Sequence, residues 1–374
     1  MGIIEKNMIF DSKEKKRIGI LTVHSNANPG SMLQAYALQT SITKILNERC
    51  NCEIINYMIP NLFWGRSQGS ILPIRILIWL YFKYANKKYL EFGNKYLKLY
   101  PSKRIKPKKL SNYSNLYDAV IVGSDQIWNT RAGAYWDPNY LLDWVDKKTL
   151  KISYAASFGT DELENEWYDR FKKALLSFHA LSVRENNGVH IINCLIKNKV
   201  EWVLDPTLLL DKNYWSKIAI RPKETNYIFV YCINRSRKTE QLIREMSAKT
   251  GMEIVQCTVG LKSLLSGVKT IRFISPEEWM GYMLYSNYAV VSSFHGTAFA
   301  INFNKQFIVD TGDYRGSRMK SILKLFALED RIITQDMQID TIKTIDFVPV
   351  NEKLQKEREK SISYLKTALQ NNHG

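Results

Sequence analysis

The chain has 374 residues, of which 45% are hydrophobic and 24% charged, values that exclude wholesale disorder and allow two domains with sizeable cores. Its 53 basic and 36 acidic side chains leave a formal net charge of +17. Residues 61–110, the basic segment, hold twelve basic side chains against one acid, Glu91, so the surplus is concentrated there and the chain is not uniformly basic.

The first half of the chain alternates apolar strand-like runs with helix-like stretches. Strands are expected at 18–23, 53–57, 117–122, 152–156, 180–183 and 202–204, and helices at 31–46, 71–100, 161–178 and 185–197. This alternation is typical of βαβ units with a mostly parallel sheet. We therefore expect a charged leader over residues 1–16 and an N-terminal α/β domain over 17–222, with the basic segment inserted in it.

The alternation starts again after a polar boundary at 206–222. Strands are expected at 227–233, 253–257, 270–273, 288–291 and 306–309, and helices at 236–249, 276–285, 296–303 and 315–327. A final charged helix is expected at about 351–370, with apolar residues at a spacing of three or four. The sequence thus predicts a second α/β domain over 223–345, then a C-terminal helix and tail over 346–374.

Cysteine usage and hydropathy bear on the compartment. The five cysteines are an odd number without the paired spacing of a zinc site, so we expect reduced thiols and no metal. The longest apolar run, Ile71–Phe82, is interrupted by Pro73 and Arg75 and is too short to cross a bilayer. The polar stretch Met1–Arg17 holds no signal-peptide core. We expect a cytoplasmic protein.

Polar groups follow the predicted strands, at the edge where parallel α/β sheets bind ligands. His295, within Ser292–Gly296 at the start of a helix, can donate to an anion or exchange a proton near neutral pH. Asp125 can orient a sugar hydroxyl or accept its proton, and Trp128 offers a flat face to a sugar ring. Each also has a structural alternative: a histidine or aspartate capping a helix, and a tryptophan in the core.

Two further groups lie at strand ends in the first half. Arg184 is suited to bidentate binding of a carboxylate or phosphate, with a surface pair to Glu185 as the alternative. His24, Asn28 and Gly30 precede a helix that begins near Ser31 and form a candidate anion cradle. The glycine fingerprints of dinucleotide sites and of P-loops are both absent from the chain.

Taken in order, these segments resemble the polysaccharide pyruvyl transferase family over about residues 17–330. The resemblance rests on Asn28-Pro29-Gly30 with Leu33–Leu38, Gly123–Asn129, Ser182–Glu185, Asp205–Leu210, Ser292–Gly296 and Arg315–Arg318. It implies two Rossmann-like domains facing across a cleft, similar to the GT-B glycosyltransferase architecture. It also implies transfer of pyruvate from phosphoenolpyruvate (PEP) to two hydroxyls of a sugar, which yields a cyclic ketal and phosphate and needs no cofactor.

The resemblance assigns roles to the strand-end residues. The expected catalytic residues are His295, Asp125 and Arg184. The expected PEP-binding residues are Arg184, Ser293, His295, Gly296, Arg235, Arg315 and Arg318. The expected acceptor-binding residues are His24, Asn28, Gln34, Asp125, Gln126 and Trp128. Many members carry Arg-x-His-Gly where this chain has Ser293, so Arg184, Arg235, Arg315 and Arg318 are the substitutes available for binding the PEP anion.

The basic segment 61–110 has its own interpretation. Saccharide acceptors for surface polysaccharides are often carried on a polyprenyl diphosphate at the inner face of the membrane. Apolar and aromatic residues flanked by lysines are typical of a helix that lies on an anionic membrane surface, and a helix packed on the first domain is the alternative. A nucleotide-sugar glycosyltransferase and a non-catalytic assembly protein of the same family are rival functions. Nucleic-acid binding is not expected, because no binding motif is present.

Overall fold

The structure, a computed structural model, describes residues 15–24, 27–47, 49–58, 72–131, 136–233, 235–258, 265–312 and 316–370. The first half of the chain forms a parallel five-stranded sheet with the order β3-β2-β1-β4-β5. Two short parallel strands, β6 and β7, continue it past β5 through bridges such as Ile152 with Ala180. The strands are β1 (Lys16–Leu21), β2 (Cys50–Tyr57), β3 (Leu99–Ile105), β4 (Ala119–Val122), β5 (Leu150–Ser153), β6 (Leu181–Val183) and β7 (Val200–Trp202).

The second half repeats this plan in a sheet with the order β10-β9-β8-β11-β12, again parallel throughout. Its strands are β8 (Tyr227–Tyr231), β9 (Glu253–Thr258), β10 (Lys269–Arg272), β11 (Tyr288–Val291) and β12 (Gln306–Val309). In both sheets the first strand is central and the order reverses beside it, as in Rossmann-like domains. The expected α/β fold with two such sheets is confirmed.

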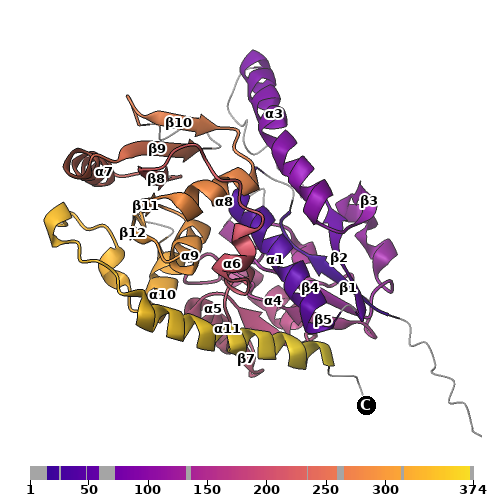
Figure 1. Cartoon of the computed structure of the whole chain (residues 1–374). Helices are drawn as coiled ribbons and strands as arrows, with labels where there is room; N and C mark the ends of the chain where they lie inside the picture. The colour runs from indigo at the N-terminus through magenta and orange to yellow at the C-terminus, as the bar shows by residue number, and fades with distance from the viewer. Residues whose placement is uncertain are drawn as a thin grey trace, which may run out of the picture.

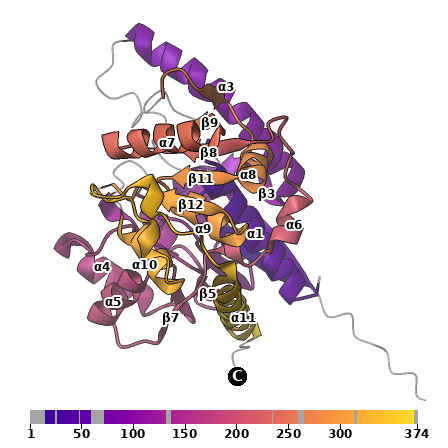
Figure 2. The ribbon, with the colours of Figure 1, turned by 60° about the vertical axis from the view of Figure 1, so that its left-hand side comes forward.

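Helices join the strands and cover the sheets (Figure 1). They are α1 (Pro29–Ile45), α3 (Leu72–Tyr96), α4 (Tyr168–Leu175), α5 (Asn186–Leu195), α6 (Lys212–Ser216), α7 (Arg237–Thr250), α8 (Pro276–Tyr285), α9 (Phe294–Asn302), α10 (Ser317–Leu325) and α11 (Phe347–Gln370). Figure 2 shows α10 beside α5, where the backbone N–H of Asn186 donates to Ser321 Oγ over 3.3 Å. The two halves therefore touch on this side of the molecule.

Local sequence explains where the central elements begin. The strands β4 and β11 are short apolar runs that are almost wholly buried, as expected when helices cover both faces of a parallel sheet. The helix α1 begins where the Asn28 side chain accepts a hydrogen bond from the Gly30 N–H and Pro29 occupies the first turn. A capping box between Ser275 and Glu278 starts α8. These caps fix the residues at which α1 and α8 begin.

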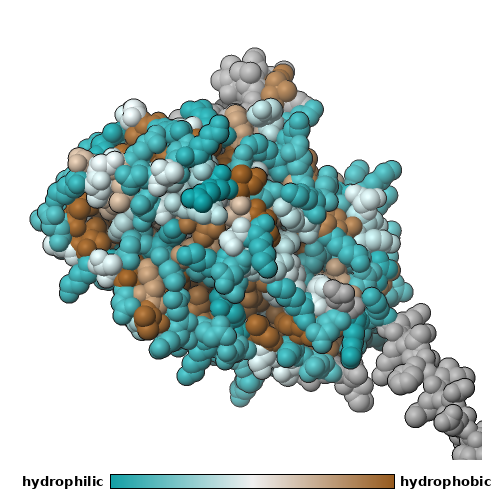
Figure 3. Space-filling model, viewed as in Figure 1, coloured by the Kyte–Doolittle hydropathy of each residue, from teal (hydrophilic) through white to brown (hydrophobic). Residues whose placement is uncertain are grey.

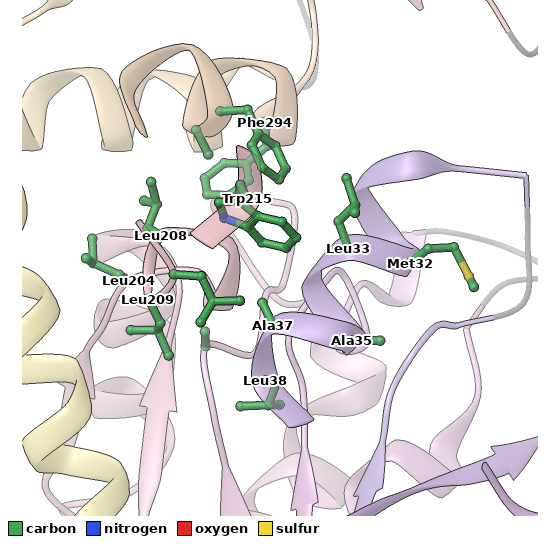
Figure 4. Close-up of a cluster of buried hydrophobic side chains, with 14 of the residues drawn as sticks. Met32, Leu33, Ala35, Ala37, Leu38, Leu204, Leu208, Leu209, Trp215 and Phe294 are labelled. Carbon is green, nitrogen blue, oxygen red and sulfur yellow. The ribbon is translucent and has the colours of Figure 1, made fainter. Parts of the chain in front are cut away.

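A continuous hydrophobic core joins the two halves. Figure 4 shows α1 residues from Met32 to Leu38 on one side of this core, with Leu204, Leu208 and Trp215 facing them. The segment 206–222, expected as a polar boundary, contributes part of this core: residues 206–210 and Trp215 are buried, and the Trp215 indole N–H donates to the Thr207 carbonyl over 3.0 Å. The rest of 211–222 is exposed or half-buried. The halves are packed together along this seam.

Three elements depart from the expectations or extend them. The strand β3 was not expected; it is a sheet edge with exposed Lys103 and Arg104, and such charges are common on edge strands. The helix α3 is one continuous helix that extends beyond the rest of the molecule in Figures 1 and 2. The helix α11 begins four residues earlier than expected and runs back along the first half, where Tyr364 donates to the Ser153 carbonyl over 2.8 Å.

The surface is mostly hydrophilic on the face shown in Figure 3, with apolar residues in small scattered groups. Within the described ranges, no helix has both the length and the apolar character needed to cross a membrane. The described residues also contain no cluster of three histidine, cysteine or acidic side chains arranged to hold a metal ion.

Candidate functional site

A cavity of about 830 Å³ lies between the two halves, at the carboxyl ends of the strands. The first half contributes Asn28, Gly30, Asp125 and Gln126. The second half contributes Tyr231, Ile233, Arg235, Ser236, Lys238, Trp279, Ser292, Ser293, Phe294, His295, Asp310, Thr311, Gly312, Arg318, Met319, Ile333, Thr334 and Gln335. This is the position at which open α/β sheets bind ligands.

Several helices begin at this cavity, and their free amide groups favour anions. At the start of α7 the Asp310 carboxylate already accepts from the Ser236 N–H, over 2.9 Å, and from the Thr239 hydroxyl. At the start of α9, Ser293 Oγ accepts from the Gly296 N–H over 3.1 Å, and the first turn of this helix holds no acidic residue. The helix α10 begins without a side-chain cap. The starts of α9 and α10 are thus better suited to an anionic ligand than the start of α7, which holds a carboxylate of the protein.

Three cationic side chains line the second-half wall of the cavity. Arg235 lies 3.4 Å from Glu240 and is largely buried. Lys238 lies in the first turn of α7, and Arg318 lies in the first turn of α10. Together with the helix starts they make this wall electropositive, which is the chemistry that a carboxylate or phosphate group requires.

His295 lies in the first turn of α9, where its side chain is 11% exposed. Its Nε2 lies 3.5 Å from Asp205 Oδ2. The ring also packs against Gly30 of α1, and a Cβ built at Gly30 would lie 2.3 Å from His295 Nδ1. The close approach of α1 to α9 therefore depends on the absence of a side chain at position 30.

Asp125 faces the cavity from the first half. It follows β4 with φ at 71°, a left-handed conformation that aspartate adopts more readily than most residues. Its Oδ2 accepts from Ser31 Oγ over 2.7 Å, and its Oδ1 accepts from the Gln126 N–H over 2.9 Å. Burial acts to raise the pKa of Asp125, but His295, Arg184 and the Ser31 hydroxyl lower it by more than burial raises it. The pKa is therefore below its ordinary value. Asp125 is therefore an ionised hydrogen-bond acceptor at neutral pH.

Arg184 lies behind the cavity wall and does not line it. Its side chain is 0% exposed; Nε donates to Glu185 Oε1 over 3.0 Å and Nη1 to Asp205 Oδ2 over 3.1 Å. Asp125 Oδ1 lies 3.9 Å from Nη1, and the guanidinium stacks on the Phe294 ring at 4.0 Å. Burial acts to lower the pKa of Arg184, but the surrounding carboxylates raise it above its ordinary value. The guanidinium is thus charged and neutralised by protein carboxylates.

The structure brings most of the predicted site residues to one cavity. The predicted residues that line it are Asn28, Asp125, Gln126, Arg235, Ser293, His295 and Arg318. Gly296 is buried one turn behind Ser293 in α9. Arg315 lies outside the described residues.

Four predicted residues do not reach the cavity, and the structure corrects their expected ligand contacts. Trp128 is fully buried, with its indole N–H on the Tyr140 carbonyl and its ring against Phe158. Gln34 is fully buried and donates to Thr22 Oγ1 over 2.9 Å. His24 is buried beside the Thr22 carbonyl, and burial lowers its pKa. The fourth is Arg184, described above.

Sequence reasoning did not identify every residue of the site. Lys238 and Asp310 line the cavity and were not predicted, and Asp205, noted only as a strand-end residue and part of the family resemblance, lies directly behind His295. Asp205 follows a predicted strand, which is a usable signal, but nothing local in the sequence indicates that its carboxylate meets a histidine ninety residues later. Lys238 and Asp310 look like ordinary surface residues until the second sheet is assembled.

Comparison with known proteins gives a fold and a family. UGT89C1 of Arabidopsis thaliana, complexed with UDP-L-rhamnose, is 9% identical with a TM-score of 0.50, over 94% of this chain and 95% of that chain. MnaA of S. aureus, in a co-structure with UDP, is 11% identical with a TM-score of 0.50, over 94% of this chain and 91% of that chain. At such identities the likeness shows the fold alone, which is GT-B-like.

A search of curated proteins found no significant match. The family model described as polysaccharide pyruvyl transferase matches residues 28–309, well over half of the chain. That range contains Asn28, Asp125, Ser293 and His295, which meet at the cavity from both halves. The protein therefore belongs to the polysaccharide pyruvyl transferase family.

Proposed function

We propose that this protein transfers the pyruvate unit of PEP to two hydroxyls of a saccharide acceptor, which forms a cyclic ketal and releases phosphate. Family membership supports a transferase of polysaccharide biosynthesis in general terms. The observation that carries the proposal is the pairing of His295 and Asp125 across one cavity, from opposite halves, beside an electropositive wall. An acid, a base and an anion site are the groups that this chemistry needs.

The donor binds on the second-half wall in this proposal. PEP carries a carboxylate and a phosphate, and the starts of α9 and α10 together with Arg318 and Arg235 offer amide groups and charge for both. Arg184 is a poor direct ligand, since its side chain is buried and already paired with Glu185 and Asp205. We assign it the role of holding those carboxylates in place. The arginine that many members carry at position 293 is then replaced by Arg318 and Arg235.

The acceptor binds on the first-half wall, where Asp125 orients or deprotonates its attacking hydroxyl. Protonation of the PEP methylene carbon makes C2 electrophilic, and the first hydroxyl oxygen bonds to C2 and passes its proton to Asp125. The C2–O bond to phosphate then breaks, with His295 donating a proton to the leaving phosphate. The second hydroxyl oxygen bonds to C2, which closes the ketal, and its proton is released to the site. The two protons lost by the hydroxyls thus balance the one gained by the methylene carbon and the one gained by phosphate. No cofactor enters these steps; PEP is the donor substrate.

The purified protein incubated with PEP and candidate lipid-linked saccharides tests this function. We expect phosphate release that depends on the acceptor, with the mass gain of a pyruvate ketal on the saccharide. We expect His295→Gln to lower the rate by about 10²-fold or more. Release of UDP or GDP from a nucleotide sugar instead would identify a glycosyltransferase. Turnover of neither donor with any acceptor would favour a non-catalytic member of the family.

We further propose that the acceptor is carried on a polyprenyl diphosphate and that the protein meets it at an anionic membrane surface through α3. Ile76, Leu80 and Tyr84 are spaced four residues apart, so they share one face of the helix, and they are 50%, 49% and 63% exposed. Lys83 and Lys87 are exposed on the same helix. An apolar stripe flanked by lysines is suited to the interface of an anionic bilayer.

Vesicle flotation tests this contact. We expect co-flotation with phosphatidylglycerol vesicles and not with phosphatidylcholine vesicles, and loss of binding in the double variant Ile76→Ser, Leu80→Ser. The matched control is Ile220→Ser, Val348→Ser, which removes apolar residues that are 52% and 64% exposed elsewhere on the protein. Equal loss in both variants, or no binding by the unmodified protein, would refute the α3 surface.

A further inference from the structure

Asp205 is a buried carboxylate that does not reach the cavity. It precedes the short 3₁₀ turn Pro206–Leu208, and its side chain is 0% exposed. Its Oδ1 accepts from the N–H of Thr207 over 3.0 Å and from the Thr207 hydroxyl over 2.8 Å. Its Oδ2 accepts from Ser124 Oγ over 2.9 Å and from Arg184 Nη1 over 3.1 Å. Donors from three separate segments thus fix this carboxylate in one orientation.

The charge state of Asp205 follows from the same contacts. Burial acts to raise its pKa, but His295, Arg184 and the Thr207 N–H together hold the pKa well below its usual range. Asp205 is therefore a permanent negative charge behind the cavity wall at neutral pH. A buried charge of this kind needs both its hydrogen bonds and its cationic neighbours.

The same Oδ2 atom faces His295. Nε2 of the ring lies 3.5 Å from it and is buried, without a hydrogen bond to any other described residue. Nδ1, the other ring nitrogen, lies next to Gly30. Gly30 and His295 both line the cavity, whereas Asp205 does not. Of the described groups in hydrogen-bond or ion-pair contact with the Asp205 carboxylate, His295 is the one that also lines the cavity, so the His295 ring is its direct route to a ligand there.

We propose that Asp205 is a positioning residue for His295, an inference whose effect on turnover rests on the proposed function. The carboxylate selects the ring form with its proton on Nε2 and leaves Nδ1 for the cavity. It also balances the positive charge of the ring when His295 is protonated. Arg184 completes the arrangement, because it binds Asp205 and stacks on Phe294, the residue that precedes His295.

The ring form can be measured without any activity, by nitrogen NMR of histidine-labelled protein. The chain has five histidines, and the His295 signals are those that disappear in His295→Gln. We expect the neutral His295 ring to carry its proton on Nε2, and Asp205→Asn to shift the ring toward the Nδ1-protonated form. Should Asp205→Asn fail to fold, Ser124→Ala, which removes one donor to Oδ2, should produce a smaller shift in the same direction. A ring protonated on Nδ1, or signals that neither variant moves, would overturn the inference.

Turnover provides the second arm. We expect Asp205→Asn to lower kcat for phosphate release by about 10²-fold while KM for PEP changes by less than about threefold. Asp211→Asn is the matched control, since Asp211 caps α6 at an exposed position outside the cavity, and its kcat should be unchanged. An equal loss in both variants, or a raised KM with normal kcat, contradicts a positioning role. If the unmodified protein releases no phosphate, the proposed function fails and the NMR result still decides the role of Asp205.

Discussion

Gly30 and His295 meet at the cavity from the two halves of the chain, and the space between them leaves no room for a side chain at position 30. A Cβ at position 30 would lie 2.4 Å from Cγ of the His295 ring, far inside contact distance. Alanine is well tolerated in the first turn of a helix, so the local cost of the substitution is small. The added methyl group would therefore collide with the His295 ring, and the ring would have to move.

Gly30→Ala is therefore expected to displace His295 and lower phosphate release by at least about tenfold. Gly93→Ala in α3 is the matched control, because a Cβ there meets only Met32 Cε at 3.5 Å. That control should keep full activity and gain up to about 1 kcal/mol of stability. Activity assays and urea unfolding of both variants make the comparison, and a fully active Gly30→Ala protein would contradict the observed contact.

Asp205 also predicts a dependence of stability on pH. Its pKa in the folded protein is lower than the unfolded value of about 3.9, since His295 and Arg184 outweigh the opposing effect of burial. The resulting stability is present above about pH 4 and is lost as the pH falls toward the folded pKa. Urea unfolding between about pH 7 and pH 3 should show a steeper decline for the unmodified protein than for Asp205→Asn. Parallel declines would remove Asp205 as a source of acid sensitivity.

At this scale the sequence predicted residue types and strand ends better than it predicted side-chain direction. His295 and Asp125 reach the cavity as expected, because both follow a strand directly. Trp128 follows the same strand as Asp125 but turns into an aromatic cluster with Phe158 and Phe171. Arg184 also lies at a strand end, but its guanidinium forms ion pairs with the carboxylates of Asp125, Glu185 and Asp205 and does not reach the cavity. Long-range partners decide such outcomes, and local patterns do not contain them.

The helix starts at the cavity are the elements that make it suited to an anionic ligand. Ser293 caps α9 inside the cavity, whereas Ser275 caps α8 outside it, each through a bond of 3.1 Å from a backbone N–H in the first turn. Removal of either hydroxyl removes the side-chain hydrogen bond that caps its helix. Only one of the two caps lies where the donor is proposed to bind.

Ser293→Ala and Ser275→Ala should each lower the free energy of unfolding by about 1 kcal/mol. Only Ser293→Ala should also weaken binding of PEP, because the first turn of α9 contacts the proposed donor position. Urea unfolding and calorimetric titration with PEP separate the two effects. Equal PEP affinity in both variants would indicate that the donor anion binds elsewhere, with the start of α10 as the next position to test.

Element prediction succeeded where periodicity was strong. The strands β11 and β12 have the predicted bounds, since each is a compact apolar run between polar turns. The strand β3 was missed because Pro101, Lys103 and Arg104 conceal the pattern, and it forms only as the partner of β2. The 206–222 segment is mostly exposed from residue 211 onward, as a polar boundary should be, but the burial of Leu208–Leu210 and Trp215 was not predicted. The structure of a sheet edge or of a segment between two domains depends on contacts with residues far away in the sequence, and local patterns do not reveal those contacts.

At the scale of the molecule, Asn302 is a direct tie between the halves. It lies at the end of α9, and its side-chain N–H groups donate to the carbonyls of Thr207, over 3.0 Å, and Leu210, over 2.8 Å. Both carbonyls belong to the segment that leads from the first half to the second. A second tie is the half-buried ion pair of Lys88 in α3 and Glu278 in α8, which contributes less because solvent still screens it.

Asn302→Ala leaves two buried carbonyls without these donors and should lower the free energy of unfolding by about 1–3 kcal/mol. Asn213→Ala, at an exposed position of α6, should change it by less than about 0.5 kcal/mol. Thermal and urea unfolding measure both. If the two variants proved equally stable, the packing of Trp215 and its neighbours would hold the halves together without this tie.

The return of α11 to the first half has a mechanical consequence. The chain passes from the first half to the second after Leu204 and comes back with α11, where Ser361 Oγ accepts from the Leu204 N–H over 3.0 Å. The chain thus links the two halves twice along its length, so any rotation of one half against the other would have to move the α11 contact as well as the segment that follows Leu204. The return of α11 therefore restrains any opening of the cavity between the halves.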